Sequence, residues 1–391
     1  GAEFLLPLFR EKEPFMREMT FAAPCHFGLE SVLAGEMRRL DLEGVSAADG
    51  RVLFKGDEHA LARANLCLRT AERVLVLLGE FEAKTFTELF DQVRQLPFEE
   101  FIGRQDAFPV KGHSNKSQLH SVPDCQSIIK KAAVERLKEK YGVGWFEETG
   151  PVHQIQFQIL KDRVSIYLDT SGAGLHKRGY RRNSTEAPIK ETLAAGILDL
   201  AWIRKDSTLY DPFCGSGTFL IEGALKAMNI PAGITRRFAA QSWSSIPASV
   251  WQQERARGLD LVRRDAKFAA YGSDLDPAAV ELALDNAHKA GVAQRIRIRT
   301  RDIREFKTVT DTGIVVTNPP YGERLLDQKA ARELYKIMGQ QFRRRDGFSY
   351  GIITPDEEFE KNFGRRADKH RKLYNGMIKC DYYMYLGGRK R

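Results

Sequence analysis

The sequence has few cysteines, and their spacing fits neither a zinc site nor a disulfide framework. The five are Cys25, Cys67, Cys125, Cys214 and Cys380, and no two of them form a Cys-x-x-Cys pair. Structural zinc sites and small disulfide-linked domains both depend on closely spaced or paired cysteines. We therefore expect no metal site and a reducing, cytoplasmic location.

Long hydrophobic runs are also missing. The longest lie at residues 74–78 and 313–316, far short of the roughly 20 apolar residues that cross a bilayer. We therefore expect no membrane association. The chain has 391 residues and is 42% hydrophobic, which predicts two or three globular domains. Its net charge of +9 favours a polyanionic partner such as a nucleic acid.

Two common phosphate-binding motifs are absent from the glycine-rich turn DPFCGSGTF at residues 211–219. The third glycine of the dinucleotide fingerprint would fall at Leu220, and no Gly-Lys-Ser/Thr follows. Gly215 and Gly217 allow a tight turn and a close approach to a ligand. Asp211 precedes the turn, and an acid there suits a cationic ligand better than a pyrophosphate. S-adenosylmethionine, with a sulfonium and an ammonium group, is such a ligand.

The first half of the chain mixes strands and helices. Residues 44–56 alternate like a hairpin around an Asp-Gly turn. Residues 85–96 form a helical pattern with Thr85 as its N-cap, and a longer pattern ends at Gly142. Residues 153–170 predict two strands joined at 161–163. A basic segment follows, and we interpret it as a linker or arm whose cations contact RNA: Lys177, Arg178, Arg181 and Arg182.

From residue 189 onward strands alternate with helices, which predicts a mostly parallel sheet. Asp274 and Asp302 each follow a predicted strand, where the first suits ribose hydroxyls and the second an adenine amine. The long interval before Asp274 indicates an insertion at 233–258. The segment RIRIRTRD places arginines on one face and isoleucines on the other, which is typical of an edge strand.

Four motifs occur in a fixed order along this second half of the chain. DPFCGSGTF, GSDLDP, RD and NPPYGERL resemble those of class I S-adenosylmethionine-dependent methyltransferases with an NPPY-type motif. The segments at 20–40, 117–137, 172–198 and 372–385 resemble the bacterial THUMP-domain RNA methyltransferases, which are similar to the 23S rRNA guanine-N2 methyltransferase family. The resemblance covers residues 19–388.

The resemblance implies an α/β fold with a seven-stranded Rossmann-like methyltransferase domain, preceded by an α+β ferredoxin-like and THUMP region that binds RNA. The last strand of the methyltransferase sheet should be antiparallel. A second methyltransferase domain, found in some longer relatives, is not expected. The implied boundaries are a flexible extension at 1–18, a ferredoxin-like segment at 19–70, a THUMP domain at 71–170, a basic linker at 171–188 and the methyltransferase domain at 189–391.

The resemblance also implies the cofactor site and the catalytic loop. The catalytic candidates are Asn318, Pro319, Pro320 and Tyr321. The S-adenosylmethionine-binding candidates are Asp211, Phe213, Gly215, Gly217, Thr218, Asp274, Leu275, Asp302, Ile303 and Asn318.

The chemistry of the NPPY loop supports this assignment. The lone pair of an exocyclic base amine is delocalised, so two acceptors must orient it and stabilise the charge that develops on nitrogen. The Asn318 side chain and the Pro319 carbonyl can be these acceptors, and Tyr321 can stack on an extruded base. The alternatives are an adenine-N6 methyltransferase on DNA or RNA and a non-catalytic RNA-binding protein. The THUMP-like half and the GER after Tyr321 favour RNA and guanine.

Overall fold

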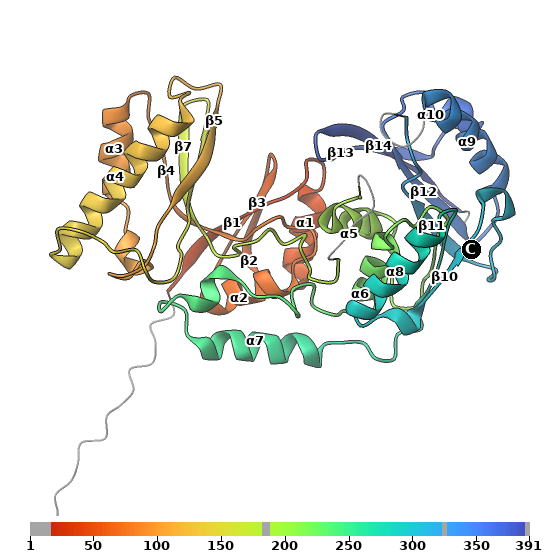
Figure 1. Ribbon diagram of the computed structural model, residues 1–391, viewed down its shortest axis with the longest axis horizontal. Coiled ribbons are helices and arrows are strands. Elements are labelled where there is room, and N and C mark those ends of the chain that lie inside the picture. Colours follow the sequence, from red (N-terminus) through yellow and green to blue (C-terminus); the bar gives the residue numbers. More distant parts are fainter. Residues whose placement is uncertain (1–16, 182–187, 323–326, 388–391) are drawn as a thin grey trace, which may run out of the picture.

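The computed structural model describes residues 17–181, 188–322 and 327–387. Two lobes stand side by side, and each is built on one seven-stranded sheet (Figure 1). Every helix in the described ranges is too short or too polar to span a bilayer. The predicted extension at 1–18 lies almost wholly outside these residues.

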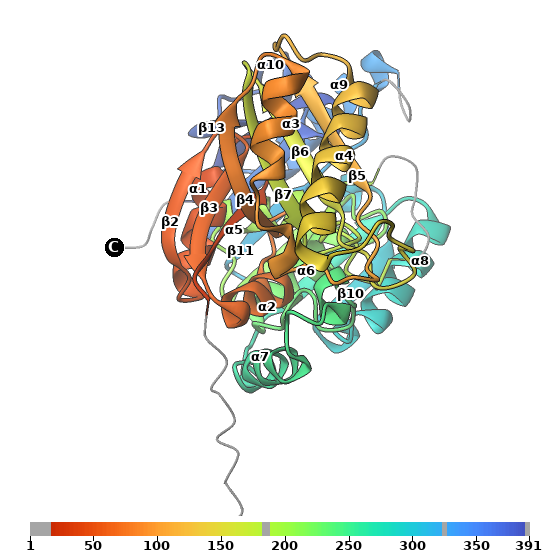
Figure 2. The same ribbon diagram turned by 90° about the vertical axis from the view of Figure 1, so that its left-hand side faces the viewer.

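The first sheet belongs to the N-terminal lobe. Its helices cover one face, and α3 and α4 stand in front of its strands in Figure 2. The strands are β1 (Met19–Pro24), β2 (Glu43–Ala48), β3 (Arg51–Gly56), β4 (Leu75–Glu82), β5 (Val110–Asn115), β6 (Ile155–Leu160) and β7 (Arg163–Asp169), and the helices are α1 (Glu30–Arg39), α2 (Glu58–Cys67), α3 (Phe86–Arg94) and α4 (Val122–Tyr141).

This sheet is continuous across the predicted boundary between the ferredoxin-like segment and the THUMP domain. The strand order is β2-β3-β1-β4-β7-β6-β5. β4 pairs with β1 through Phe21–Val76 and Ala22–Leu75, and its other edge pairs with β7. The two segments therefore share backbone hydrogen bonds and form one body.

The turn and the two helix ends predicted in the first lobe are present in the structure. The Asp49-Gly50 turn joins β2 to β3, and Gly50 has a φ of 72°. Thr85 accepts a hydrogen bond from the Glu88 N–H, and the Glu88 side chain returns to the Thr85 N–H, which makes a capping box. Gly142 ends α4 in the left-handed conformation with a φ of 62°.

The second sheet is confirmed as a doubly wound sheet with an antiparallel last strand. Its order is β10-β9-β8-β11-β12-β14-β13, and only the pairings of β14 are antiparallel. The strands are β8 (Thr208–Asp211), β9 (Ala269–Asp274), β10 (Ile296–Thr300), β11 (Gly313–Thr317), β12 (Phe348–Thr354), β13 (Lys369–Asn375) and β14 (Ile378–Tyr385), and the helices are α5 (Glu191–Leu200), α6 (Thr218–Ala227), α7 (Ala248–Asp260), α8 (Pro277–Lys289), α9 (Gln328–Gln341) and α10 (Phe359–Phe363).

Helices cover both faces of the second sheet. Side chains of α5, α6 and α8 share a core with one face, and those of α9 and α10 share a core with the other. The parallel strands β8, β9, β10 and β11 all end at one edge. The topology therefore brings the predicted site residues together at the carboxyl ends of these strands, where ligands bind in open α/β sheets.

The predicted insertion at 233–258 fastens the two lobes together. Its buried Trp243 stacks on His153 of the first lobe, with ring centroids 4.3 Å apart, and donates its indole N–H to the Val152 carbonyl at 3.0 Å. Its helix α7 packs on α2, where Arg63 makes a bidentate ion pair with Glu254, both bonds being 3.0 Å. The insertion therefore contributes its apolar side chains to the core of the other lobe.

Candidate active site

A cavity of about 730 Å³ opens at the carboxyl edge of the second sheet. It is large enough for a nucleoside-sized ligand, since ligand pockets span about 300–1,000 Å³. All four catalytic candidates line it. So do all the cofactor candidates except Gly217, namely Asp211, Phe213, Gly215, Thr218, Asp274, Leu275, Asp302, Ile303 and Asn318.

The glycine-rich turn leads from β8 into α6. Gly215 and Gly217 both have positive φ, at 49° and 81°. A Cβ on Gly217 would lie 3.1 Å from the Cβ of Ala283. Gly217 therefore does not line the cavity itself. It is the N-cap residue of α6, and it lets the turn pack closely against α8.

Asp274 ends β9 and braces the glycine-rich turn. One of its carboxylate oxygens accepts from the Gly215 N–H at 3.0 Å, and the other accepts from the Asp276 N–H at 3.0 Å. A carboxylate oxygen has a second lone pair, so Asp274 keeps acceptor capacity toward the cavity. Asp276 instead caps α8 by accepting from the Ala278 N–H at 2.9 Å. The exposed Leu275 adds an apolar wall.

Asp302 follows β10 and is held in place locally. One of its oxygens accepts from the Arg304 N–H at 2.8 Å, and the other pairs with the Arg304 guanidinium at 2.9 Å. The buried Ile303 comes next on the cavity wall. A carboxylate beside an apolar side chain suits the amine edge and the face of an adenine ring.

Asp211 is buried beneath the cavity. It accepts a hydrogen bond from the Thr317 hydroxyl at 2.7 Å and another from the Phe213 N–H at 3.2 Å. Burial raises the pKa of Asp211 to about 7, although both hydrogen bonds act in the opposite direction. Thr317 precedes Asn318 in the chain. This side-chain hydrogen bond therefore connects the end of β8, which leads to the glycine-rich turn, with the end of β11, which leads to the catalytic loop.

The NPPY loop leaves β11 directly into the cavity. Pro319 is buried, whereas Asn318, Pro320 and Tyr321 are half-buried and line the opening. The Asn375 amide, from the β13–β14 hairpin, donates to the Tyr321 hydroxyl at 3.4 Å. This contact was not predicted, because its two residues lie 54 positions apart. Glu323 and Arg324, the residues of GER after Gly322, lie outside the described residues.

Other cavity residues also escaped prediction. Ile189 before α5, Leu334 and Ile337 on α9, and Ile378 on β14 complete the apolar walls. Nothing in their sequence surroundings marks them as binding residues, because only the tertiary fold brings these elements to the edge.

The candidate catalytic chemistry does not involve Cys214. This thiol lies in the glycine-rich turn, and burial raises its pKa well above its usual value. A thiol held in its neutral form is a poor nucleophile. No cluster of three or more potential metal ligands occurs among the residues that the structure describes.

The basic segment at 171–188 differs from the expected arm. Arg178 is buried in an ion pair with Glu222 on α6, at 3.1 Å, so its proposed contact with RNA phosphates is corrected. Arg181 pairs with Glu191 at 2.8 Å and donates to Thr218 at 3.2 Å, so it supports the glycine-rich turn instead. Lys177 is exposed and stays a candidate, and Arg182 lies outside the described residues.

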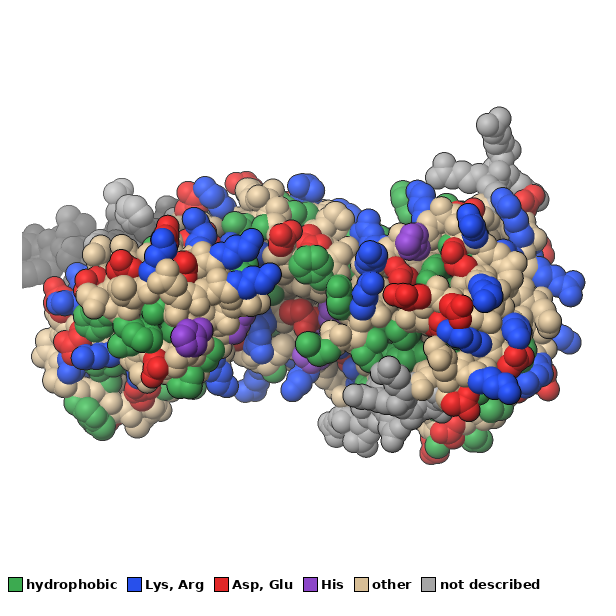
Figure 3. Space-filling view, turned by 90° about the horizontal axis from the view of Figure 1, so that it is seen from above, with side chains coloured by type: hydrophobic (Ala, Val, Ile, Leu, Met, Phe, Trp, Pro, Cys, Tyr) green, Lys and Arg blue, Asp and Glu red, His purple; other side chains and the backbone are tan. Residues whose placement is uncertain are grey.

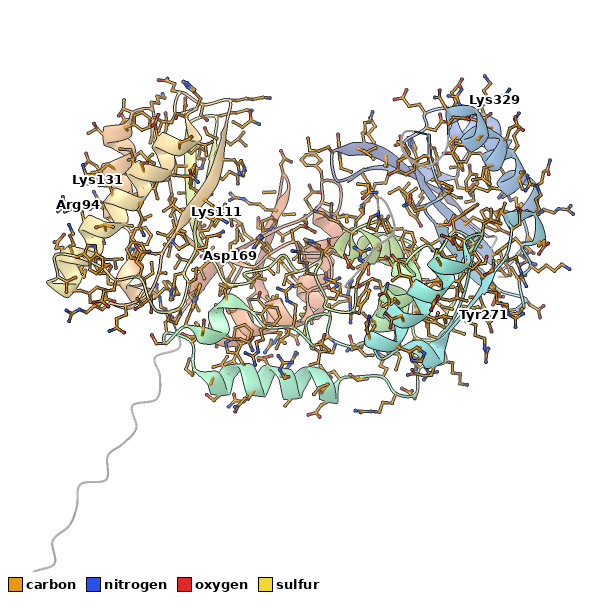
Figure 4. The ribbon with its side chains drawn as sticks, in the orientation of Figure 1. Arg94, Lys111, Lys131, Asp169, Tyr271 and Lys329 are labelled. Atoms are coloured by element: carbon orange, nitrogen blue, oxygen red, sulfur yellow. The ribbon has the colours of Figure 1, made fainter. Side chains whose placement is uncertain are left out.

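Cations elsewhere on the first lobe lie on two sides of it. Lys111 on β5 lies on the side that faces the second lobe, whereas Arg94 and Lys131 lie on α3 and α4 at the far side (Figure 4). Seen from above, the surface between the lobes is hollowed, with lysines and arginines around it (Figure 3).

The sequence matches three families in order along the chain. Residues 20–75 match the RlmL ferredoxin-like domain, residues 83–169 the THUMP domain, and residues 178–384 the family described as RMKL-like, methyltransferase domain.

Two curated relatives show how far the similarity extends. The chain is 44% identical over 372 residues to "Putative RNA methyltransferase YpsC" of Bacillus subtilis (strain 168), covering 95% of this chain and 96% of that protein. It is 33% identical over 374 residues to "Ribosomal RNA large subunit methyltransferase K/L" of Shewanella amazonensis, covering 93% of this chain and 52% of that protein. The chain thus spans about half the length of that K/L relative.

Solved structures have the same fold over nearly the whole chain. "SMU.472, a putative methyltransferase complexed with SAH" superposes with a TM-score of 0.91 at 40% identity, covering 96% of this chain and 100% of that one. "A predicted N6-adenine-specific DNA methylase" from Listeria monocytogenes gives 0.90 at 43% identity, covering 95% and 97%.

Proposed function

This chain belongs to the RMKL-like methyltransferase family and carries its ferredoxin-like and THUMP domains, and we propose that it methylates the exocyclic N2 of a guanine in ribosomal RNA with S-adenosylmethionine as donor. The observation that carries the proposal is that one cavity brings the following residues together. It is lined by Asp274 and Asp302, by the NPPY loop, and by the Asp211 carboxylate, which Thr317 joins to that loop.

The residues present fit S-adenosylmethionine. Asp274 offers acceptors for ribose hydroxyls, and Asp302 with Ile303 offers an acceptor and an apolar face for adenine. Asp211 is a buried acid whose partners are neutral donors, so an ammonium group nearby would satisfy its charge. When bound, this cofactor supplies an electrophilic methyl group.

The catalytic loop then acts by orientation. The Asn318 side-chain oxygen and the Pro319 carbonyl accept the two N–H groups of the target amine, which directs its lone pair at the methyl group. Both acceptors stabilise the positive charge that develops on nitrogen. The alkylated nitrogen is acidic, so the proton needs no strong base. The Tyr321 ring holds the extruded base by stacking.

A second candidate is adenine-N6 methylation. The solved relative from Listeria monocytogenes is described as a predicted N6-adenine-specific DNA methylase, and an NPPY loop can hold either amine. The THUMP domain favours RNA over DNA. Incubation with labelled cofactor and unmodified ribosomal RNA, followed by nucleoside analysis, separates the candidates. We expect N2-methylguanosine; N6-methyladenosine would support the second candidate, and no labelled nucleoside would contradict methylation of either base in ribosomal RNA.

Asn318→Ala tests the role of the loop. We expect single-turnover methylation to fall about 10²–10³-fold with cofactor affinity retained, because one acceptor of the transition state is lost. Asn318→Asp keeps an acceptor and should retain more activity. Tyr321→Phe should be mild and Tyr321→Ala severe if stacking is what counts. An Asn318→Ala variant that turns over like the parent would make Asn318 a structural residue.

A further inference from the structure

Two aromatic rings are exposed together where the lobes meet. Phe27, in the turn before α1, is 57% exposed, and Tyr374 on β13 is 37% exposed. Their ring centroids lie 6.4 Å apart at 85°. Single exposed apolar side chains are normal on protein surfaces, but neighbouring large ones mark interaction sites. Here the two rings come from two different lobes.

The pair lies at the edge of the sheet that holds the cavity. β13 and β12 are both antiparallel to β14, so β13 ends at the same edge as β8 and β11. Asn375, the residue after Tyr374, contacts the Tyr321 hydroxyl, and Ile378 beyond the turn lines the cavity. Along β13, the exposed ring is therefore one residue from a contact with the catalytic loop.

The backbone holds the Phe27 ring in place. Gly28 has a φ of 92°, and a Cβ there would lie 2.6 Å from the Lys372 carbonyl oxygen. Arg371 donates to the Gly28 carbonyl at 3.1 Å. The Glu30 carboxylate accepts from the Gly28 and Gly50 N–H groups at 2.9 and 3.0 Å. A turn fixed by these contacts presents a preorganised surface, which lowers the entropy cost of binding.

The charge around the pair suits a nucleotide. Lys372 shares the exposed face of β13 with Tyr374, since side chains alternate along a strand, and Leu373 is buried on the other face. His370 lies on the same face as Lys372, with its ring 3.4 Å from the Asp381 carboxylate. Single-stranded nucleic acids are bound by aromatic faces for the bases and cations for the backbone. In Figure 3 the hollow between the lobes holds hydrophobic, acidic and histidine side chains, with lysines and arginines among those around it.

We propose that Phe27 and Tyr374 form a stacking site for an unpaired base next to the target nucleotide. The proposal rests on the proposed function, because it requires an RNA substrate. Extruding a target base leaves its neighbour without a stacking partner. An aromatic surface at the rim of the cavity replaces that partner. Stacking accepts any base, so this site selects unpaired structure at the target and not sequence.

The double variant Phe27→Ala/Tyr374→Ala tests the site. We expect its affinity for protein-free 23S rRNA transcripts to fall about 5- to 150-fold, the range for the loss of one stacked base. Cofactor affinity should not change, because neither ring lines the cavity, and the melting temperature should change little, because both rings are partly exposed. The matched control is Trp202→Ala, an aromatic 65% exposed at the opposite end of α5 from Ile189, which should bind like the parent.

Two further variants separate stacking from a structural effect. Tyr374→Phe keeps the ring and should restore binding to the parent value. Phe27→Trp should bind RNA, and its added fluorescence should be quenched when a fragment containing the target loop is added; the parent, with four tryptophans, gives the background.

The outcomes are distinguishable from failure of the proposed function. A parent protein that methylates no RNA contradicts the function itself. A parent that methylates RNA, with a double variant of equal affinity and turnover, overturns only the stacking site. A double variant whose sedimentation changes while RNA affinity does not would identify the surface as a contact between copies, and this also overturns the proposal.

Discussion

At the scale of single residues, the hydrogen bond from Thr317 to Asp211 joins two motifs that are 106 positions apart. Each motif could be predicted from its own sequence, because acids and amides at strand ends have local signals. The bond between the motifs could not be predicted, because it depends on β8 and β11 being neighbours in the sheet.

Asp211 predicts a pH dependence of cofactor affinity. Its pKa is about 7 in the folded protein, and a cationic ligand would lower it, so binding releases a proton below that pH. Affinity should therefore rise by up to about tenfold per pH unit from about pH 5 and level off above pH 7. Calorimetry across this range measures the slope.

Two variants control this prediction. Asp211→Asn should remove the slope, because no proton is exchanged. Thr317→Val should move the plateau to higher pH, since a hydrogen bond that stabilises the carboxylate is lost. The contribution of Asp211 to the stability of the fold changes with pH in the opposite direction from cofactor affinity. The raised pKa contributes stability below the usual value of 3.8, and this contribution is lost as pH rises through about 7. A flat affinity profile in the parent would contradict the assignment of Asp211.

Lys177 and Arg178 are neighbours with different expected roles. Arg178→Ala should lower the free energy of unfolding by about 3–5 kcal/mol, because it leaves Glu222 buried without its ion-pair partner. Lys177→Ala should leave unfolding unchanged and flatten the slope of log RNA affinity against log salt by up to ~0.9. Denaturant unfolding and salt titrations measure both. Equal unfolding curves for the two variants would refute the structural role of Arg178.

At the scale of elements, hairpins and caps were predictable, whereas long-range pairings were not. The Asp49-Gly50 turn and the Thr85 cap have signals within a few residues. β5 has no hydrophobic alternation, because it is an edge strand with Lys111, His113 and Asn115 exposed. The pairing of β1 with β4 spans more than fifty residues, and nothing in either strand specifies the other.

The insertion is the element with the largest expected effect on stability. Trp243→Ala removes a buried ring that lies between the lobes and should cost about 3–5 kcal/mol. Trp145→Ala, at a residue 73% exposed, is the matched control and should cost almost nothing. Denaturant unfolding followed by circular dichroism measures both, and a Trp243→Ala curve like that of the control would show that the insertion does not join the lobes.

At the scale of the whole molecule, the second lobe depends on the first. A chain of residues 188–391 would expose Phe238, Trp243 and Trp251 and would leave Glu222 without Arg178. We expect such a chain to lose cooperative unfolding and cofactor binding together, although the sequence indicates a separable domain. A truncated chain that binds cofactor like the parent would show that the lobes fold independently.

The strand β10 has a consequence for how the protein behaves at high concentration. It lies at the open edge of the second sheet, where unpaired N–H and C=O groups can template a strand from another molecule. Arg297 and Arg299 are exposed along it, and their charges repel an approaching copy that carries the same arginines. These side chains thus guard against aggregation. Exchanging them for valine would raise strand propensity and lower solubility at once.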